Sequence, residues 1–177
     1  NLKKEKLGDL IGKTIKKIER RSKYILIFFN DNHVLLIHLG MTGRFYFMKN
    51  KNKKIDTSFY NNSNIIIKHN HIKIDFDKFN LIYNDIRKFG FIKKINKNNL
   101  THSSHLLRLG CEPLTNQFCS NYLKKKIYNK KTSIKNLLMN QSVVAGLGNI
   151  YANEALYLSK IKPEKPGHAL KDDEIKK

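Results

Sequence analysis

The stretch Gln141–Leu156 contains the residue types best suited to binding an anion. Gly146 and Gly148 lie on either side of Leu147, and Asn149 follows at once. Glycine permits backbone angles that other residues avoid and keeps side chains out of a partner's way. Apolar residues then recur at helical spacing, so Asn149 is predicted to be an N-cap whose helix directs free N–H groups and partial positive charge outward. This pattern indicates a phosphate site, although a helix–turn–helix corner with glycines for tight packing would also explain it.

Net charge indicates the class of anion that the chain binds. The 177 residues include 35 Lys and Arg against 14 Asp and Glu, which gives a formal charge of +21, and both halves of the chain are positive. Such a balance favours a polyanion such as nucleic acid, because neutralising its phosphates releases counterions. Compositional drift toward Lys, Asn and Ile is the alternative explanation for the charge.

Cysteine usage and hydropathy exclude several classes. Cys111 and Cys119 are too few for a disulfide framework or a four-ligand zinc site, so we expect no cofactor in this chain and a reducing, cytoplasmic setting. No apolar run approaches the length of a membrane span, and nothing resembles a signal peptide, so no membrane partner is expected.

Apolar runs predict the strands of the first half. The runs 24–29 and 34–39 are rich in β-formers and joined by a short polar link, which predicts a hairpin buried on both faces. The segment 7–18 is mixed and amphipathic, and 49–63 reads as a solvated loop. Alternation of apolar and polar residues at 71–76 predicts a strand with one wet face. The remaining strands are expected at 44–48, at 81–83 as the hairpin partner of 71–76, and at 91–95.

The period becomes helical after about Ser120. Helices are predicted at 118–128, 133–141 and 149–159, and the acidic segment 171–177 resembles the start of another. The predicted fold class is α+β with two domains. These are a β-sandwich-like N-terminal domain, an intervening linker and an all-α domain, over residues 1–99, 100–116 and 117–177 respectively.

Separated strings occur along the chain in an order that is specific as a set. The strings are Arg20–Tyr24, His38–Gly43, His69–His71, Tyr83–Gly90, Leu109–Leu114, Lys131–Lys135 and Gly146–Tyr151. In this order they resemble the formamidopyrimidine-DNA glycosylase family, bacterial enzymes that remove 8-oxoguanine and ring-opened purines.

The resemblance implies a β-rich domain, a helix–two-turns–helix domain, and damaged duplex DNA bent in the cleft between them. It implies base excision followed by β,δ-elimination at the abasic site, performed by a monomer. Met41, Arg87 and Phe89 match the triad that fills the gap left by an everted nucleotide. An extruded base leaves stacking and pairing unmet, and a thioether, an aromatic ring and a guanidinium can replace them. Core packing is the alternative role for Met41 and Phe89.

Other positions match family contacts to DNA. Asn149 matches the phosphate clamp, and Lys23 matches a lysine near the lesion that assists base removal and strand cleavage. A surface lysine at the start of a strand is the plainer interpretation of Lys23, and a core histidine that of His38. The DNA-contact candidates are His69, Arg87 and Lys131, with Lys135 and His38 as further candidates.

Two parts of the family pattern have no match in the sequence. The family nucleophile is an N-terminal proline amine beside a glutamate, whereas this chain begins Asn1-Leu2-Lys3. The family also ends in a four-cysteine zinc finger, which we expect to be the only zinc site of such proteins. The sequence is therefore expected to be a middle fragment that binds damaged DNA with little or no catalysis, and borohydride trapping would test this.

Two alternatives remain open at this point. A sister group of the same family acts on oxidised pyrimidines, although Met41 together with Arg87 and Phe89 favours the purine branch. A basic nucleic-acid-binding protein without catalysis is the second alternative, and it predicts no gain in affinity for an abasic duplex and indifference to Met41→Ala.

Overall fold

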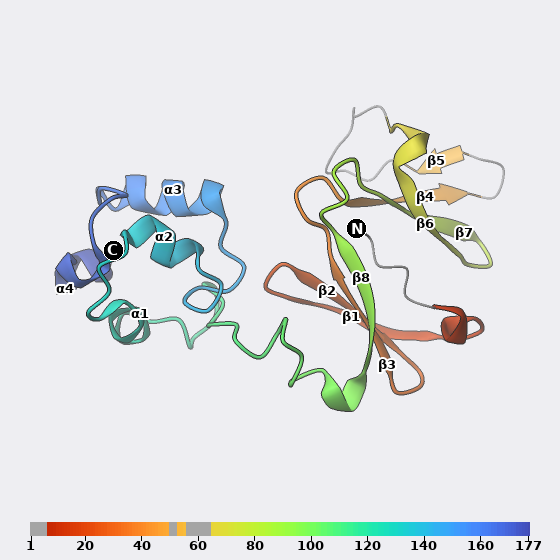
Figure 1. Ribbon diagram of the computed structural model, residues 1–177, viewed down its shortest axis with the longest axis horizontal. Coiled ribbons are helices and arrows are strands. Elements are labelled where there is room, and N and C mark those ends of the chain that lie inside the picture. Colours follow the sequence, from red (N-terminus) through yellow and green to blue (C-terminus); the bar gives the residue numbers. More distant parts are fainter. Residues whose placement is uncertain (1–6, 50–52, 56–64) are drawn as a thin grey trace. The chain divides into compact units, whose positions relative to one another are not determined.

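The computed structural model describes residues 7–49, 53–55 and 65–177 (Figure 1). The predictions for the first residues of the chain and for most of the 49–63 loop lie outside these residues. The chain divides into two compact units, residues 1–19 with 24–96 and residues 20–23 with 97–177. The predicted linker thus falls in the second unit, as does the four-residue segment Arg20–Lys23, which ends in a turn at Ser22 and Lys23 and whose place in this unit the sequence did not indicate.

The first unit contains two four-stranded sheets, with strand orders β1-β2-β3-β8 and β5-β4-β7-β6 (Figure 1). Its strands are β1 (Ile15–Arg21), β2 (Tyr24–Phe29), β3 (His33–His38), β4 (Arg44–Lys49), β5 (Lys53–Ile55), β6 (Asn70–Asp75), β7 (Phe79–Asn84) and β8 (Phe91–Asn96). Short 3-10 helices are η1 (Gly8–Leu10), η2 (Ile67–His69) and η3 (Lys97–Asn99).

The predicted hairpins are confirmed. β2 and β3 pair antiparallel with Ile27 opposite Leu35, and most of their residues are buried without alternation. β6 pairs with β7, and its exposed Lys73 and Asp75 alternate with less exposed Ile72 and Ile74. The core of this unit combines buried residues of β2, β3, β7 and β8, namely Ile27, Leu35, Ile37, Tyr83 and Ile92.

Two strands were missed by the sequence interpretation. β1 occupies part of the segment interpreted as mixed and amphipathic, and β5 lies within the predicted 49–63 loop. Both are edge strands, and β1 has five exposed residues between two partly buried ones. Edge strands carry charged residues that discourage pairing with other chains. Apolar periodicity, on which the prediction depended, is therefore absent from them.

The second unit is helical, with α1 (Ser120–Ile127), α2 (Ile134–Met139), α3 (Asn149–Leu158), α4 (Asp172–Ile175) and the 3-10 helix η4 (Gly167–Ala169). All four helices lie where the sequence predicts them, and the first three end one or two residues earlier. Ser133 caps α2 by accepting a hydrogen bond from the Asn136 N–H at 3.4 Å. The α+β fold class is thus confirmed. The helices enclose a core of Ile127, Ile134, Leu137, Leu138, Val143, Val144, Ala152, Leu156 and Ile161.

Candidate nucleic-acid interface

Two loops of the first unit, residues 39–43 and 85–90, carry the predicted gap-filling side chains and are called the two-loop cluster. The structure brings the three side chains together. Arg87 Nη1 donates a hydrogen bond to Met41 Sδ at 3.1 Å, and the guanidinium carbon lies 4.4 Å from the centre of the Phe89 ring. Met41 is 73% exposed and Phe89 is 56% exposed, which excludes core packing as their role. The cluster therefore presents two large apolar groups and a cation to solvent.

The loops of this cluster approach each other through their backbones. Gly40 has a φ of +65°, and a Cβ there would lie 2.8 Å from the Gly90 nitrogen. A Cβ on Gly90 would lie 1.8 Å from Tyr83 Oη, which belongs to the core. Both glycines are therefore required for the contact itself.

A buried carboxylate joins the two loops. Asp85 is fully buried and accepts hydrogen bonds from Thr42 Oγ1 at 2.5 Å and from the Gly90 N–H at 2.9 Å. Burial alone would raise the pKa of the Asp85 carboxyl, but the hydrogen bonds outweigh burial and hold that pKa below its ordinary range. Asp85 was not predicted from the sequence to have a role of its own. The available signal was its place within the Tyr83–Gly90 string.

The two candidate histidines are tied to this cluster through backbone atoms. His38 ends β3, and its Nδ1 accepts a hydrogen bond from the Gly40 N–H at 3.1 Å while its ring stacks on Phe91 at 5.8 Å. His69 ends η2, and its carbonyl accepts from the Asp85 N–H at 3.0 Å. Both side chains are partly buried. Contact of either ring with DNA stays a prediction.

Residues 141–148, the glycine loop, connect α2 to α3 in the second unit. Gly146 has a φ of 88°, in the region that favours glycine. Gly148 is the N-cap of α3, and its carbonyl accepts from the Ala152 N–H at 2.9 Å. The prediction of Asn149 as N-cap is therefore wrong by one position. Because Gly148 already has the extended backbone of an N-cap, Asn149 is the first helical residue, with an exposed side chain beside the N–H groups of the first turn.

Gln141 holds the glycine loop in shape. Its Oε1 accepts hydrogen bonds from the Gly146 N–H at 2.8 Å and from Ser22 Oγ at 3.0 Å. Its Nε2 donates to the carbonyl oxygens of Met139 and Leu147, each at 2.9 Å. The amide thus satisfies donors and acceptors at once. No structural role was predicted for Gln141, which begins the glycine-containing stretch 141–156.

Glu112 fixes the turn between β1 and β2 within the same unit. Its carboxylate accepts from the Ser22 N–H at 2.7 Å, from Arg20 Nη2 at 2.6 Å and from Arg21 Nη1 at 3.1 Å. Burial would raise the pKa of Glu112, but these hydrogen bonds outweigh burial and lower it. Ser22 adopts a φ of 56°, so the chain turns sharply at that point.

The fixed turn directs Lys23 toward the start of α3. Lys23 Nζ lies 3.5 Å from the position that a Cβ on Gly148 would occupy, next in sequence to Asn149. An ammonium and the N-terminus of a ten-residue helix therefore converge on one point. Lys131 is exposed two residues before Ser133, and the partly buried Lys135 is the second residue of α2. Their contacts with DNA stay predictions.

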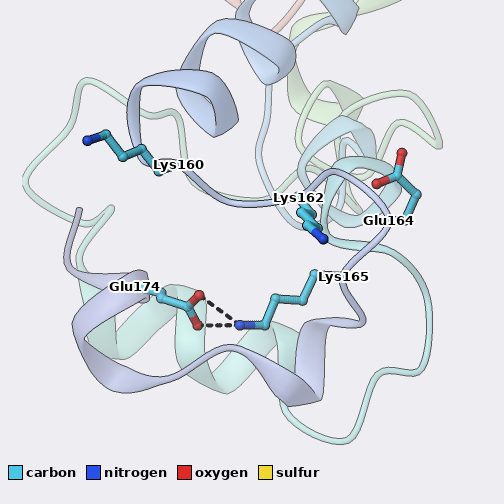
Figure 2. Close-up of a pocket in the computed structure, with 5 residues that line it drawn as sticks. All are labelled: Lys160, Lys162, Glu164, Lys165 and Glu174. Atoms are coloured by element: carbon cyan, nitrogen blue, oxygen red, sulfur yellow. Dashed lines mark hydrogen bonds and ion pairs between the residues drawn. The ribbon is translucent and has the colours of Figure 1, made fainter.

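A surface pocket of about 500 Å³ lies beyond the other end of α3 (Figure 2). Lys165 and Glu174 point toward each other across it, and Lys165 Nζ is 2.7 Å from both carboxylate oxygens. The ion pair joins α4 to the turn after α3. The pocket is lined by Lys160, Lys162, Glu164, Lys165 and Glu174.

Within residues 7–49, 53–55 and 65–177, no three His, Cys, Asp or Glu side chains gather as a metal would require. Cys111 is partly buried, and Cys119 is exposed. Over the same residues, no helix has both the length and the apolar character needed to cross a bilayer.

Two domains of a known family match most of the chain. Residues 2–92 match the formamidopyrimidine-DNA glycosylase N-terminal domain, and residues 109–177 match the formamidopyrimidine-DNA glycosylase H2TH domain. A formamidopyrimidine-DNA glycosylase of Rickettsia bellii is 42% identical over 168 residues, which are 94% of this chain and 57% of that protein. One from Ligilactobacillus salivarius is 39% identical over 177 residues, 99% of this chain and 60% of that protein.

Solved structures agree with these matches. The Lactococcus lactis formamidopyrimidine-DNA glycosylase bound to DNA with an abasic site superposes with a TM-score of 0.80 at 33% identity, over 93% of this chain and 58% of that one. MutM in complex with DNA containing carbocyclic 8-oxo-G gives 0.82 at 32% identity, over 95% and 59%. The chain spans less than two thirds of the length of these relatives. The sequence strings, the two domain matches and the shared fold together establish that this chain belongs to the formamidopyrimidine-DNA glycosylase family.

Proposed function

We propose that this chain forms the damaged-DNA-binding part of a glycosylase and AP lyase that removes oxidised purines during base-excision repair. The observation that carries the proposal is the two-loop cluster, where Met41, Arg87 and Phe89 meet from loops 46 residues apart and remain exposed. Relatives solved with 8-oxo-G, Fapy-dG or abasic DNA support the same substrate class.

The cluster has the chemistry that an emptied duplex position requires. Turning a nucleotide out of the stack leaves neighbouring base pairs unstacked and the opposite base unpaired, at a cost of a few kcal/mol. Met41 and Phe89 supply apolar surface to stack in the gap, as wedge side chains do in other DNA-bending proteins. Arg87 supplies several N–H donors for the orphaned base, and the resemblance to the family implies that this base is preferably cytosine.

The start of α3 supplies the second contact of the proposed function. Lys23 Nζ and the first turn of α3 offer an ammonium and free backbone N–H groups to one phosphate, and the exposed Asn149 adds an amide. Such contacts hold the duplex in register without reading its bases. We assign Lys23 in addition the assisting role in base removal and strand cleavage that its match to the family implies.

Equilibrium binding to two short duplexes tests the proposal. One duplex carries a stable abasic analogue opposite cytosine, and the other is intact. We expect the chain to prefer the abasic duplex, and Met41→Ala to reduce that preference about tenfold, which corresponds to about 1.4 kcal/mol of stacking. Ile11→Ala is the matched control, because Ile11 is also a highly exposed apolar residue of the first unit and lies outside both loops.

Equal affinity for the two duplexes would contradict the proposal and favour a non-catalytic basic protein that binds any nucleic acid. Binding of that kind would be abolished by salt whether or not a lesion is present. Varying the base opposite the abasic site separates the two branches of the family, since dependence on cytosine indicates the purine branch.

Oxidised pyrimidines are a second candidate substrate. A wild-type Lactococcus lactis relative has been solved with DNA that contains an oxidised pyrimidine, so one fold of this kind accommodates both lesions. For either substrate we propose a bacterial cytoplasmic protein associated with the nucleoid and acting as a monomer.

A further inference from the structure

The exposed side chains of the two-loop cluster need an internal support, because they do not pack in the core. Met41 lies in a turn, and Arg87 and Phe89 lie in an irregular segment between β7 and β8. Residues 86–89 are all exposed, whereas Asp85 and Gly90 at the two ends of this segment are buried. The contacts that fix the three side chains must therefore lie at those buried ends.

The Asp85 carboxylate accepts four hydrogen bonds, two at each oxygen. Oδ1 accepts from Thr42 Oγ1 at 2.5 Å and from the Arg87 N–H at 3.2 Å. Oδ2 accepts from the Gly90 N–H at 2.9 Å and from Tyr83 Oη at 3.1 Å. Thr42 Oγ1 also accepts from the Arg87 N–H at 3.1 Å, which closes a small network across the two loops.

All four donors to Asp85 are uncharged, so the buried charge depends on their geometry alone. Hydrogen bonds to an ionised acceptor are shorter and about twice as strong as neutral ones. A carboxylate with no exposed surface is strongly disfavoured when it loses such partners. Movement of either loop would break part of this network, so the carboxylate resists such movement.

The backbone of Asp85 extends the support to the neighbouring strands. Its N–H donates to the His69 carbonyl at 3.0 Å, and its carbonyl lies 2.8 Å from His71 Nε2. The residue is therefore attached on one side to η2 and β6 and on the other side to both loops. Its side chain is directed at the loops and at Tyr83 Oη of β7.

We propose that Asp85 is a positioning residue for damage recognition, whose carboxylate holds Met41 in register with Arg87 and Phe89 so that the three enter the duplex as one unit. This role rests on the proposed function, because it concerns the same gap-filling side chains. It assigns lesion preference to a residue that touches neither base nor phosphate.

Asp85→Asn is the sharpest test because it hardly changes shape. An amide keeps one acceptor oxygen and replaces the other with a donor, which must then face either the Gly90 N–H or the Arg87 N–H. Neither backbone group can turn to become an acceptor. Asp75→Asn is the matched control, since it removes the same charge from an exposed position of the same unit.

Two measurements on the full chain decide the proposal. The first is the ratio of affinities for an abasic-analogue duplex and an intact duplex, together with the fluorescence of 2-aminopurine placed next to the abasic analogue, which stays opposite cytosine. We expect Asp85→Asn to lower the ratio at least fivefold and to reduce the fluorescence change, with affinity for intact DNA within twofold of wild type. A cooperative thermal unfolding transition, like that of wild type, verifies that the variant is folded.

The second measurement is the ¹³C-methyl NMR spectrum of methionine in the free protein, which needs no DNA. We expect the Met41 methyl resonance to shift or broaden in Asp85→Asn and to stay unchanged in Asp75→Asn. An unchanged Met41 signal with an unchanged affinity ratio would overturn the proposal, as would equal losses for both duplexes. If the wild-type chain shows no preference for the abasic duplex, the proposed function is contradicted. In that case the NMR measurement still tests whether Asp85 positions Met41.

Discussion

The two candidate DNA-contacting regions are each organised by one polar side chain, but by opposite chemistry. In the two-loop cluster the centre is Asp85, which only accepts hydrogen bonds, and the loops turn N–H and O–H groups toward it. In the glycine loop the centre is Gln141, which accepts from one N–H and one hydroxyl and donates to two carbonyls. The groups that a loop turns inward therefore determine whether a carboxylate or an amide can stabilise it.

The regions also differ in what their glycines do. Gly90 lies against Tyr83 Oη and the His38 carbonyl, so its lack of a side chain lets the backbones touch. Gly148 faces only the end of the Lys23 side chain at 3.5 Å, so its lack of a side chain leaves room for a partner. Gly90 is therefore required for folding, whereas Gly148 leaves room for binding, and the conformational need for glycine in its loop falls on Gly146.

Alanine at these two glycines gives the largest expected contrast. Gly90→Ala forces a methyl group to within 1.8 Å of a buried, hydrogen-bonded hydroxyl. We expect it to lower the free energy of unfolding by about 4 kcal/mol, at the upper end of overpacking effects. Gly148→Ala should change it by less than about 1 kcal/mol and weaken binding to abasic and intact DNA alike. Denaturant titration with DNA-binding assays checks both, and equal stability losses would remove the contrast.

Replacing the central amide of the glycine loop with a carboxylate tests the comparison between Asp85 and Gln141. In Gln141→Glu a carboxylate oxygen would face the carbonyls of Met139 and Leu147 in place of a donor. We expect a loss of about 3 kcal/mol at pH 7, because a charge is left unpaired in a partly buried site. The new carboxyl would have a raised pKa when folded, so the loss should appear as pH rises above about 4.3 and diminish in acid. A loss independent of pH would mean that the site tolerates the charge.

Removing the hydroxyl that donates to each central side chain is expected to change the free energy of unfolding least. Thr42 donates to a charged acceptor and accepts from Arg87, whereas Ser22 donates to the neutral Gln141. We expect Thr42→Val to cost about 2 kcal/mol and Ser22→Ala about 1 kcal/mol, as for hydrogen bonds to charged and neutral groups. Thermal unfolding of the two variants in one buffer measures the order, and a reversed order would show that charge does not distinguish the two centres.

Sequence reasoning located most elements and the exposed side chains of the site. The strands with continuous apolar runs and the helices with a clear period were predicted, and so were Met41, Arg87 and Phe89 as a group. β1 was missed because an exposed edge strand has no apolar pattern to detect. Asp85 was missed for a different reason, since its importance depends on donors as far as 43 residues away that only the fold brings together.

The segment Arg20–Lys23 has a consequence for how the chain is made. It belongs with residues 97–177, and the partners of Ser22 lie 90 and 119 positions later, at Glu112 and Gln141. A ribosome therefore releases this hairpin tip long before its partners emerge, and the Ser22 N–H and hydroxyl bind water until then. Closing so long a loop is the slow kind of step in folding, and the proposed anion site at the start of α3 is complete only after it.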